Sequence, residues 1–598
     1  MDISEKIEKL RKEMAKRNIN AYVIPSADYH QSEYVGDYFK AREYMTGFTG
    51  SAGTAVFTAS EAALWTDGRY FLQAAEQLEQ TEICLQKMGE PGTPTIDAYL
   101  REKLPEGGCV GFDGRTVGIS VGNLYEKIAG EKGGSVYYKE DLVDFVWTDR
   151  PELPRKKAFA LEEQYAGESS VSKLERVREK MESYGADVHL LTSLDDIGWL
   201  LNIRGQDVEY FPLLLSYALV WMDQVDLYVE EDKISENSRK EFDKNQIIMH
   251  PYNEIYRDIE TVTEGCKILL DPRRVNYALY KNLPASAELI NKENPSTLMK
   301  AVKNETEAEH IRQAHLKDGI AHTRFFYWLK HTVGKERITE RDAARKLEEF
   351  RAQQEHYLGA SFEPISAYKE HGAIVHYTAT EETDADLEPK GFLLTDTGGH
   401  YWEGSTDITR TVALGPLTEE EKEDFTLVAA GMLKLADSVF PAGCTGAVLD
   451  YAAREPLWKR YKDFNHGTGH GVGYLGNIHE PPATINWRIR PGNTRVLQKN
   501  MVITDEPGIY IEGSHGIRTE NELMVKEEPA DGFLGFEILT FVPVDLDAIL
   551  PDLLGEEGCR LLNAYHSKVR EMVGPYLPEE EKEWLDYYTR PVRPARAI

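Results

Sequence analysis

The sequence is poor in cysteine, and its cysteines form no recognisable pair. The 598 residues contain five, and they are scattered along the chain: Cys84, Cys109, Cys266, Cys444 and Cys559. Their number is odd and no CxxC pair occurs, so the sequence predicts neither a disulfide framework nor a zinc ribbon.

Long apolar runs are also missing. The richest stretch, residues 213–222, is interrupted by Ser216 and Tyr217 and has about half of the ~20 residues that a membrane span needs, so we expect a buried strand there. At the N-terminus Ile3, Ile7 and their neighbours stand at helical spacing among charged residues, which favours an amphipathic surface helix over a signal peptide. We therefore expect no membrane partner and a cytoplasmic location, where free thiols persist.

Positive charge is in deficit. The chain has 69 Lys and Arg residues against 101 Asp and Glu, for a formal net charge of -32. Such a chain repels the phosphates of nucleic acids and anionic lipid surfaces. We expect neither as a partner.

The length suggests about three or four domains, and the composition is that of an ordinary globular protein. Proline and charge concentrate in residues 149–155, as in an exposed linker, and a second break falls at Asn294-Pro295. Asn304 and Glu307 then resemble a capping box that opens a long helix. The predicted domains are residues 1–155, 156–300 and 301–598.

The first two predicted domains share a similar order of elements. In the first, we expect strands at residues 21–24, a pair within 44–57, and another at 62–65. A similar order recurs at 188–191, 197–203, 213–221 and 225–229. This pattern indicates an internal duplication of a mixed α/β unit.

Candidate chemistry lies in the third domain. An apolar strand at residues 393–399 ends in a predicted glycine turn, and a return strand follows at 405–411. If the two strands pair as a hairpin, Asp396 and Asp407 can project towards one pocket. An Asp beside a turn more often caps the backbone, so these two residues alone prove little.

Three further candidate donors follow in glycine-rich or strand-end contexts: His470, Glu506 and Glu520. The five together offer four carboxylates and one imidazole. Hard oxygen donors with one imidazole suit Mn²⁺ best, with Co²⁺, Fe²⁺ or Zn²⁺ as alternatives, because no thiolate is present to select a softer ion. The pattern predicts a metal site.

This ordered set resembles the pita-bread metallopeptidase family, which includes methionine aminopeptidase, prolidase and Xaa-Pro aminopeptidase. The resemblance covers residues 300–540. The two units before it look like the N-terminal domains of the long, three-domain Xaa-Pro aminopeptidases, as do the segments at 65–71 and 466–473. The implied fold is α/β (α+β), with two related creatinase-N-terminal-like domains before a pita-bread catalytic domain.

The resemblance implies that two divalent cations share an activated water. It makes Asp407 and Glu520 bridging ligands, assigns Asp396 to one ion, and assigns His470 and Glu506 to the other. Four carboxylates then offset the four charges of two divalent ions. Without metal these carboxylates would repel one another and some would take up protons.

Roles for further residues also come from the resemblance. Glu506 is expected to move a proton towards the leaving nitrogen, and His479 to donate to the oxyanion. His466 and His376 are expected to bind substrate, with His466 and His479 at the catalytic centre. Arg69 is expected to reach the substrate from the first domain, although it could simply pair with Asp67.

The implied substrates are peptides with proline at the second position, and the implied assembly is a homodimer. A prolidase-like dipeptidase is one alternative, but the duplicated N-terminal region argues against it. A non-enzymatic pita-bread module that binds peptides is a second. Modules of that kind, like creatinase-like amidinohydrolases, lack the ligands, whereas all five positions are filled here.

Overall fold

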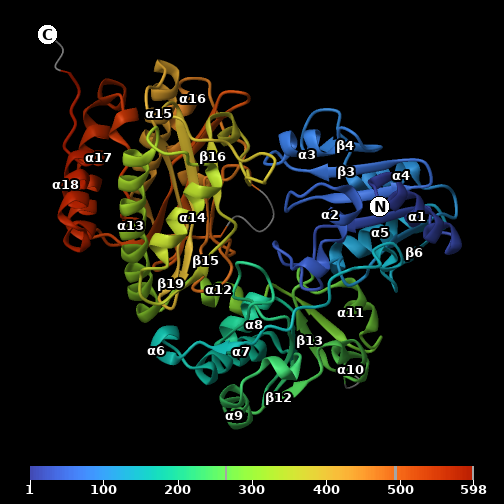
Figure 1. Cartoon of the computed structure of the whole chain (residues 1–598). Helices are drawn as coiled ribbons and strands as arrows, with labels where there is room; N and C mark the ends of the chain where they lie inside the picture. The colour runs from blue at the N-terminus through green and yellow to red at the C-terminus, as the bar shows by residue number, and fades with distance from the viewer. Residues whose placement is uncertain (263–264, 490–494, 596–598) are drawn as a thin grey trace. The chain divides into compact units, whose positions relative to one another are not determined.

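The computed structural model describes residues 1–262, 265–489 and 495–595. The chain forms two compact units: residues 1–161 with 168–296, and residues 162–167 with 297–598 (Figure 1). The three predicted domain ranges, 1–155, 156–300 and 301–598, stay predictions.

The first unit contains two six-stranded sheets with the same topology. The first sheet has the order β4 (Ile83–Lys87), β3 (Ala62–Thr66), β2 (Thr54–Thr58), β1 (Ala21–Pro25), β5 (Cys109–Phe112) and β6 (Ser135–Tyr137). The second has the order β12 (Ile247–His250), β11 (Val225–Tyr228), β10 (Tyr217–Trp221), β8 (Val188–Leu191), β13 (Lys267–Leu270) and β14 (Glu288–Asn291).

Strand directions match as well. In each sheet two antiparallel pairings are followed by a parallel edge strand, and the other side of the sheet is parallel throughout. The predicted internal duplication is therefore confirmed, but the expected strand at residues 197–203 is wrong, because residues 194–200 form helix α8 and only Ile203–Arg204 is a strand. The helices of this unit are α1 (Ile3–Lys16), α2 (Ala41–Thr46), α3 (Phe71–Leu78), α4 (Ile96–Lys103), α5 (Ile119–Glu131), α7 (Ser170–Tyr184), α8 (Leu194–Leu200), α9 (Glu236–Lys244), α10 (Ile255–Asp258) and α11 (Tyr277–Asn282).

The two halves of this unit meet through equivalent loops, which follow β5 and β13. The Ile119 amide donates to the Val275 carbonyl at 3.1 Å, and the Tyr277 amide donates to the Val117 carbonyl at 2.7 Å. Between these bonds Gly118 and Asn276 form an antiparallel bridge. The contact is reciprocal, with each loop giving and receiving the same kind of bond.

Local predictions in this unit met different outcomes. The amphipathic helix is confirmed as α1, because Ile7 and Leu10 are buried on its inner face. The predicted strand pair within residues 44–57 is wrong in its first half. Residues 41–46 form helix α2, which ends at Gly47 with a left-handed φ of 73°, and only Thr54–Thr58 is a strand.

The second unit is built from small sheets. Two three-stranded sheets have the orders β15 (Tyr357–Ala360), β18 (Gly399–Tyr401), β19 (Gly404–Ser405) and β16 (Ile365–Tyr368), β17 (Phe392–Thr397), β20 (Ile408–Ala413). A four-stranded sheet has the order β21 (Phe440–Pro441), β28 (Phe533–Ile538), β27 (Asn521–Glu527), β24 (Val502–Asp505). Two sheets of two strands each pair β22 (Gly469–His470) with β23 (Thr484–Ile485), and β25 (Gly508–Ile511) with β26 (His515–Arg518).

Helices surround these sheets. They are α6 (Glu163–Ala166), α12 (Pro295–Ala301), which begins in the first unit, α13 (Glu305–Thr332), α14 (Glu340–Arg351), α15 (Glu419–Ala436), α16 (Gly446–Trp458), α17 (Pro551–Val573) and α18 (Glu579–Tyr588). In Figure 1 α13, α17 and α18 lie side by side. The predicted capping box is confirmed: Asn304 accepts from the Glu307 amide, and the Glu307 side chain accepts from the Asn304 amide.

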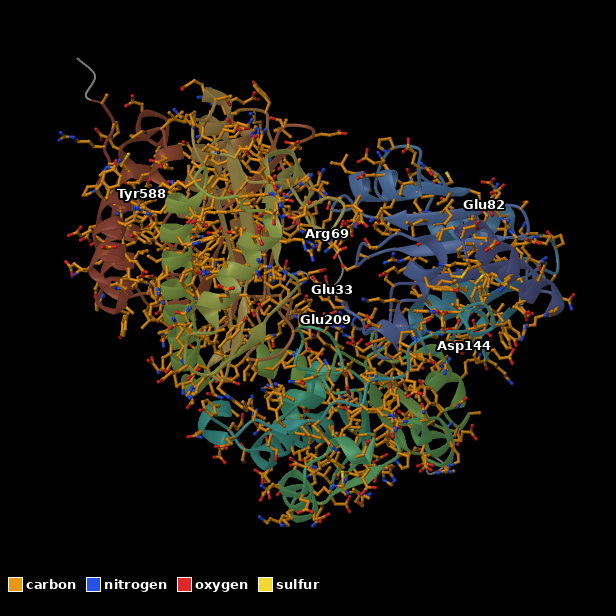
Figure 2. The ribbon with its side chains drawn as sticks, viewed as in Figure 1. Glu33, Arg69, Glu82, Asp144, Glu209 and Tyr588 are labelled. Atoms are coloured by element: carbon orange, nitrogen blue, oxygen red, sulfur yellow. The ribbon has the colours of Figure 1, made fainter. Side chains whose placement is uncertain are left out.

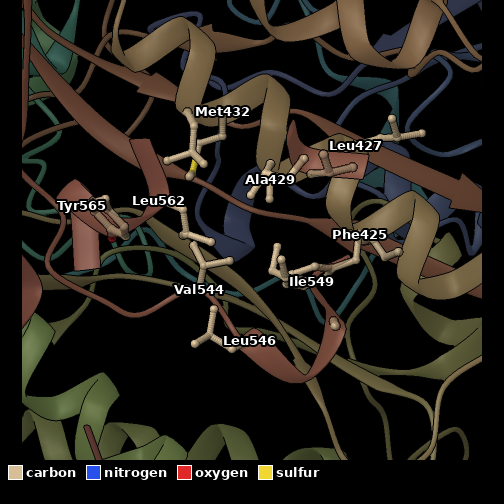
Figure 3. Close-up of a cluster of buried hydrophobic side chains, with 14 of the residues drawn as sticks. Phe425, Leu427, Ala429, Met432, Val544, Leu546, Ile549, Leu562 and Tyr565 are labelled. Carbon is tan, nitrogen blue, oxygen red and sulfur yellow. The ribbon is translucent and has the colours of Figure 1, made fainter. Parts of the chain in front are cut away.

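The core of the second unit is apolar where α15 and α17 meet. Figure 3 shows Phe425 and Met432 of α15 in one cluster with Leu562 of α17, Val544 and Ile549. Burial of this cluster holds the helices against the sheets. No helix in the described part of the chain is long and apolar enough to cross a membrane.

Candidate metal centre

Two of the predicted ligands come from one antiparallel pair of strands. Strands β17 and β20 pair with Asp396 opposite Thr409, and Asp407 immediately precedes β20. The pairing confirms the predicted hairpin. Because successive side chains of a strand point to opposite faces, Asp396 and Asp407 face one side, and their neighbours Thr397 and Thr406 face the other.

The predicted glycine turn at the end of the first strand is wrong. The chain continues past Gly398 as β18, which pairs with β15 and β19 in another sheet. A Cβ on Gly398 would lie 1.8 Å from the Thr406 carbonyl oxygen, so this glycine serves a close approach of two backbones rather than a turn.

The other predicted ligands arrive from separate strands. His470 ends β22, Glu506 follows β24 and Glu520 precedes β27. Ligand atoms of Asp407, His470 and Glu520 all lie within 4.8 Å of one another. His470 Nε2 lies 3.4 Å from Asp407 Oδ2 and 3.6 Å from Glu506 Oε1. These four donors are therefore brought together.

Hydrogen bonds orient the donors. The Gly471 carbonyl can only accept, so its 3.0 Å contact with His470 Nδ1 places the proton there and leaves the Nε2 lone pair towards the carboxylates. The Thr409 hydroxyl donates to Glu520 Oε2 at 2.6 Å. These bonds orient the His470 ring and the Glu520 carboxylate without a bound ion.

A buried arginine that no sequence argument singled out holds Asp396. Arg518 donates to Asp396 Oδ2 from Nε at 3.0 Å and from Nη2 at 2.7 Å. Its Nη1 also donates to the Tyr510 hydroxyl at 2.7 Å, and Tyr510 in turn donates to His466 Nε2 at 2.7 Å. Arg518 could have been singled out from the sequence, because it stands two residues before the predicted ligand Glu520. No sequence feature pointed to Tyr510.

The electrostatics of the group are those of crowded anions. Burial, then the charges of Asp396 and Glu506, raise the pKa of Asp407 well above its ordinary value. Burial, then Asp407, raises the pKa of Glu520, and burial, then Glu520, raises that of Glu506. These three buried carboxylates therefore oppose one another's ionisation.

The residues present fit divalent cations. Asp396 Oδ1 is buried and has no hydrogen-bond partner among the described residues. Oxygen donors and one imidazole nitrogen face each other at distances that a cation can bridge, and no thiolate competes. The donor set can hold hard or borderline divalent metals, as the sequence predicted, and the assignment of individual ligands stays a prediction.

His479, a predicted substrate residue, lies beside this group. The His479 ring lies 4.2 Å from the His470 ring, centroid to centroid. His376 follows Val375, whose carbonyl accepts from Arg518 Nη2 at 3.2 Å. His466 joins them through Tyr510, as described above.

Arg69 belongs to the first unit. It makes a two-point ion pair with Asp67, at 2.9 Å from Nε and 2.8 Å from Nη2, and Glu33 lies near it (Figure 2). The alternative prediction for Arg69, an ion pair with Asp67, is thus confirmed. Its contact with substrate stays a prediction.

Similarity to known families follows the same division of the chain. Residues 6–139 and 149–307 each match the creatinase/prolidase N-terminal domain. Residues 309–527 match metallopeptidase family M24, and residues 532–592 match the C-terminal region of that peptidase family.

Similarity to individual proteins extends over the whole length. Aminopeptidase P2 of Arabidopsis thaliana is 37% identical, covering 99% of this chain and 89% of the relative. A probable Xaa-Pro aminopeptidase P of Paracoccidioides brasiliensis is 36% identical, covering 99% and 100%. The X-prolyl aminopeptidase of Caenorhabditis elegans, described as a cytosolic enzyme with a di-nuclear active site, superposes with a TM-score of 0.94 at 35% identity, covering 99% and 100%.

A dipeptidase of known structure matches only part of this chain. The Xaa-Pro dipeptidase of Bacillus anthracis is 26% identical with a TM-score of 0.52, and it covers only 63% of this chain.

The fold and the donor set define a metallopeptidase with creatinase-like N-terminal domains and a pita-bread catalytic domain. Within that class, the chain belongs to the Xaa-Pro aminopeptidases, the aminopeptidase P family.

Substitution Asp407→Asn tests the metal centre. Removing one of four crowded carboxylates relieves repulsion, so the metal-free protein should unfold at the wild-type temperature or above it. Added metal should stabilise the wild type, by about 2.7 kcal/mol at one hundred times the dissociation constant, and should stabilise the variant far less. Thermal unfolding with chelator and with Mn²⁺ measures both. Asp531→Asn, at an exposed position, is the control, and an equal metal response in both variants would contradict the assignment.

Proposed function

We propose that this protein hydrolyses the peptide bond between an N-terminal residue and a following proline. The observation that carries the proposal is the convergence of four carboxylates and one imidazole in a chain similar over its full length to aminopeptidases P. Full-length coverage favours this activity over that of a prolidase, since the dipeptidase matches only part of the chain.

Two divalent cations complete the site. Asp407 and Glu520 would be ligands shared by the two cations, Asp396 would bind one of them, and His470 and Glu506 would bind the other. Bound cations supply Lewis acidity, which polarises a carbonyl and makes water a nucleophile at neutral pH. Among the candidate metals, the oxygen-rich donor set favours Mn²⁺ over Co²⁺, Fe²⁺ or Zn²⁺.

The chain's own groups move the proton and bind the peptide. Glu506 lies at the edge of the donor group, 3.6 Å from His470 Nε2, and is the general acid and base that carries a proton to the proline nitrogen. His479 donates to the oxygen that becomes negative. His466 and His376 bind the substrate on the side of the metal centre where Arg518 bonds to Asp396. Arg69 is a further substrate contact.

The cellular location and the oligomeric state of the protein are proposals as well. The worm relative is described as cytosolic, and we propose a cytoplasmic location for this protein. We also propose a homodimer. Its support is an exposed apolar group on the second unit: Val448 is 69% and Tyr451 54% exposed, and the Tyr451, Trp458 and Trp487 rings adjoin one another.

The activity is tested with a peptide that begins Arg-Pro-Pro. Free arginine should appear, chelator should abolish its release, and Mn²⁺ should restore it. An Xaa-Pro dipeptide should be hydrolysed more slowly than the longer peptide. Preferential hydrolysis of the dipeptide would instead favour a dipeptidase, and binding of the peptide without hydrolysis would favour a non-enzymatic module.

Substitution His479→Ala tests the oxyanion role. The value of kcat should fall by roughly 10² to 10³, as for other oxyanion donors, while the metal content stays unchanged. Steady-state kinetics and elemental analysis of the same preparation measure the two quantities. An unchanged kcat removes His479 from this role.

The homodimer is tested with Tyr451→Glu and light scattering. A buried charge at the centre of the apolar group should convert dimers to monomers at micromolar concentration. Met222→Glu, at a 44% exposed apolar residue of the first unit, is the matched control. A wild-type monomer, or a variant that still dimerises, would contradict the proposed interface.

A further inference from the structure

Helix α13 carries a buried polar face that the proposed reaction does not use. His315, Asp318 and His322 stand at positions i, i+3 and i+7, so they share one side of the helix. All three are fully buried. Burying so many polar groups is costly unless they serve hydrogen bonds, which directs attention to what they contact.

Asp318 contacts the back of the hairpin that carries two predicted ligands. It receives a hydrogen bond from the Thr406 hydroxyl, and Arg351 of α14 pairs with it from Nε at 2.8 Å and Nη2 at 3.2 Å. Arg351 Nη2 also donates to the Thr397 hydroxyl at 3.0 Å. One buried ion pair thus holds both threonines.

The sequence position of those threonines gives the contact its meaning. Thr397 directly follows Asp396, and Thr406 directly precedes Asp407. The Gly399 amide also donates to the Thr406 hydroxyl at 2.9 Å, which closes the link between the two strands. The ion pair is therefore hydrogen-bonded to the residue beside each of the two ligands.

The ion pair favours the charged form of Asp318. Burial opposes ionisation of Asp318, but the charge of Arg351 outweighs it and holds the pKa of Asp318 well below its ordinary range. A full charge on each partner strengthens the hydrogen bonds that each makes.

A second carboxylate holds Asp407 more directly. Glu522 Oε1 accepts from the Asp407 backbone amide at 2.6 Å. The other oxygen, Oε2, lies 3.1 Å from His315 Nε2 of α13, and both side chains are fully buried. Glu522 shares its strand face with Glu520, because the two are separated by one residue.

We infer that Glu522, Asp318 and Arg351 are positioning residues that hold Asp396 and Asp407 in register for two metal ions. They touch neither substrate nor ligand oxygen; they act through the Asp407 amide and through the threonines beside both ligands. This inference rests on the metal centre of the proposed function. Groups that orient metal ligands typically change metal affinity or activity by about 10- to 100-fold when removed.

The decisive comparison is Glu522→Gln against Glu522→Met in the full-length protein. Gln keeps an acceptor for the Asp407 amide, whereas Met has a similar length and none. We expect wild-type affinity for Mn²⁺ in Glu522→Gln and about 10- to 100-fold weaker binding in Glu522→Met. Calorimetric titration of metal-free protein measures affinity and stoichiometry, and the visible spectrum of the Co²⁺ form reports ligand geometry.

A double variant, Asp318→Leu with Arg351→Met, provides an independent arm. Replacing both members of a buried ion pair by apolar residues is often neutral for stability, so the metal-free protein should stay folded while its metal affinity falls. Arg312→Met with Glu537→Leu is the matched control, because that two-point pair joins the same helix to β28 and contacts no residue beside a ligand.

The outcomes separate two failures. A wild type that binds no metal overturns the proposed function itself. A wild type that binds metal, with unchanged affinity in both Glu522→Met and the double variant, overturns only the positioning role. Equal loss in Glu522→Gln and Glu522→Met also overturns it, because the backbone hydrogen bond would then not be what matters. If one variant does not fold without metal, the other arm decides.

Discussion

Mutual repulsion among buried carboxylates is the constraint around which the second unit is organised. Burial and mutual repulsion raise the pKa values of Asp407, Glu506 and Glu520, so these carboxylates resist ionisation together unless positive charge enters the site. Arg518 supplies part of that charge and pairs directly with Asp396. The remainder has to come from bound cations, so the protein spends folding stability on a site that is complete only when they are present.

Rigid surroundings make such a site workable. The ligands stand on strands and at strand ends, and hydroxyl groups of Thr409 and Thr406 hold the hairpin on either face. Apolar packing between α15 and α17 supports the sheets at a distance from the charges. Directional bonds therefore set the position of the donors, while non-directional burial supplies the stability of the frame.

Patterns confined to a few residues were predictable. Asn304 with Glu307 predicted the start of α13, and the apolar run before Asp396 predicted its strand. Tyr44 was misplaced because a short helix of six residues has no periodicity to detect. The continuation of the chain from β17 into β18 of another sheet at Gly398 could not be predicted, since it depends on the Thr406 backbone lying beside Gly398 in space.

Partnerships between distant segments were also out of reach. His315 and Asp318 lie in a helix whose sequence gives no sign of which strand they will face, and Tyr510 is an ordinary strand residue until Arg518 and His466 are placed around it. The ligand order along the chain carried the family resemblance. The network that orients those ligands requires coordinates.

The reciprocal contact between the halves of the first unit has an implication for how such a chain arose. Ile119 bonds to Val275 as Tyr277 bonds to Val117, which is the pattern of a two-fold symmetric interface. A single ancestral domain with this loop could have paired with an identical copy. Joining two copies in one polypeptide would then preserve a pre-existing dimer contact, and each half could diverge while the other kept the shared surface covered.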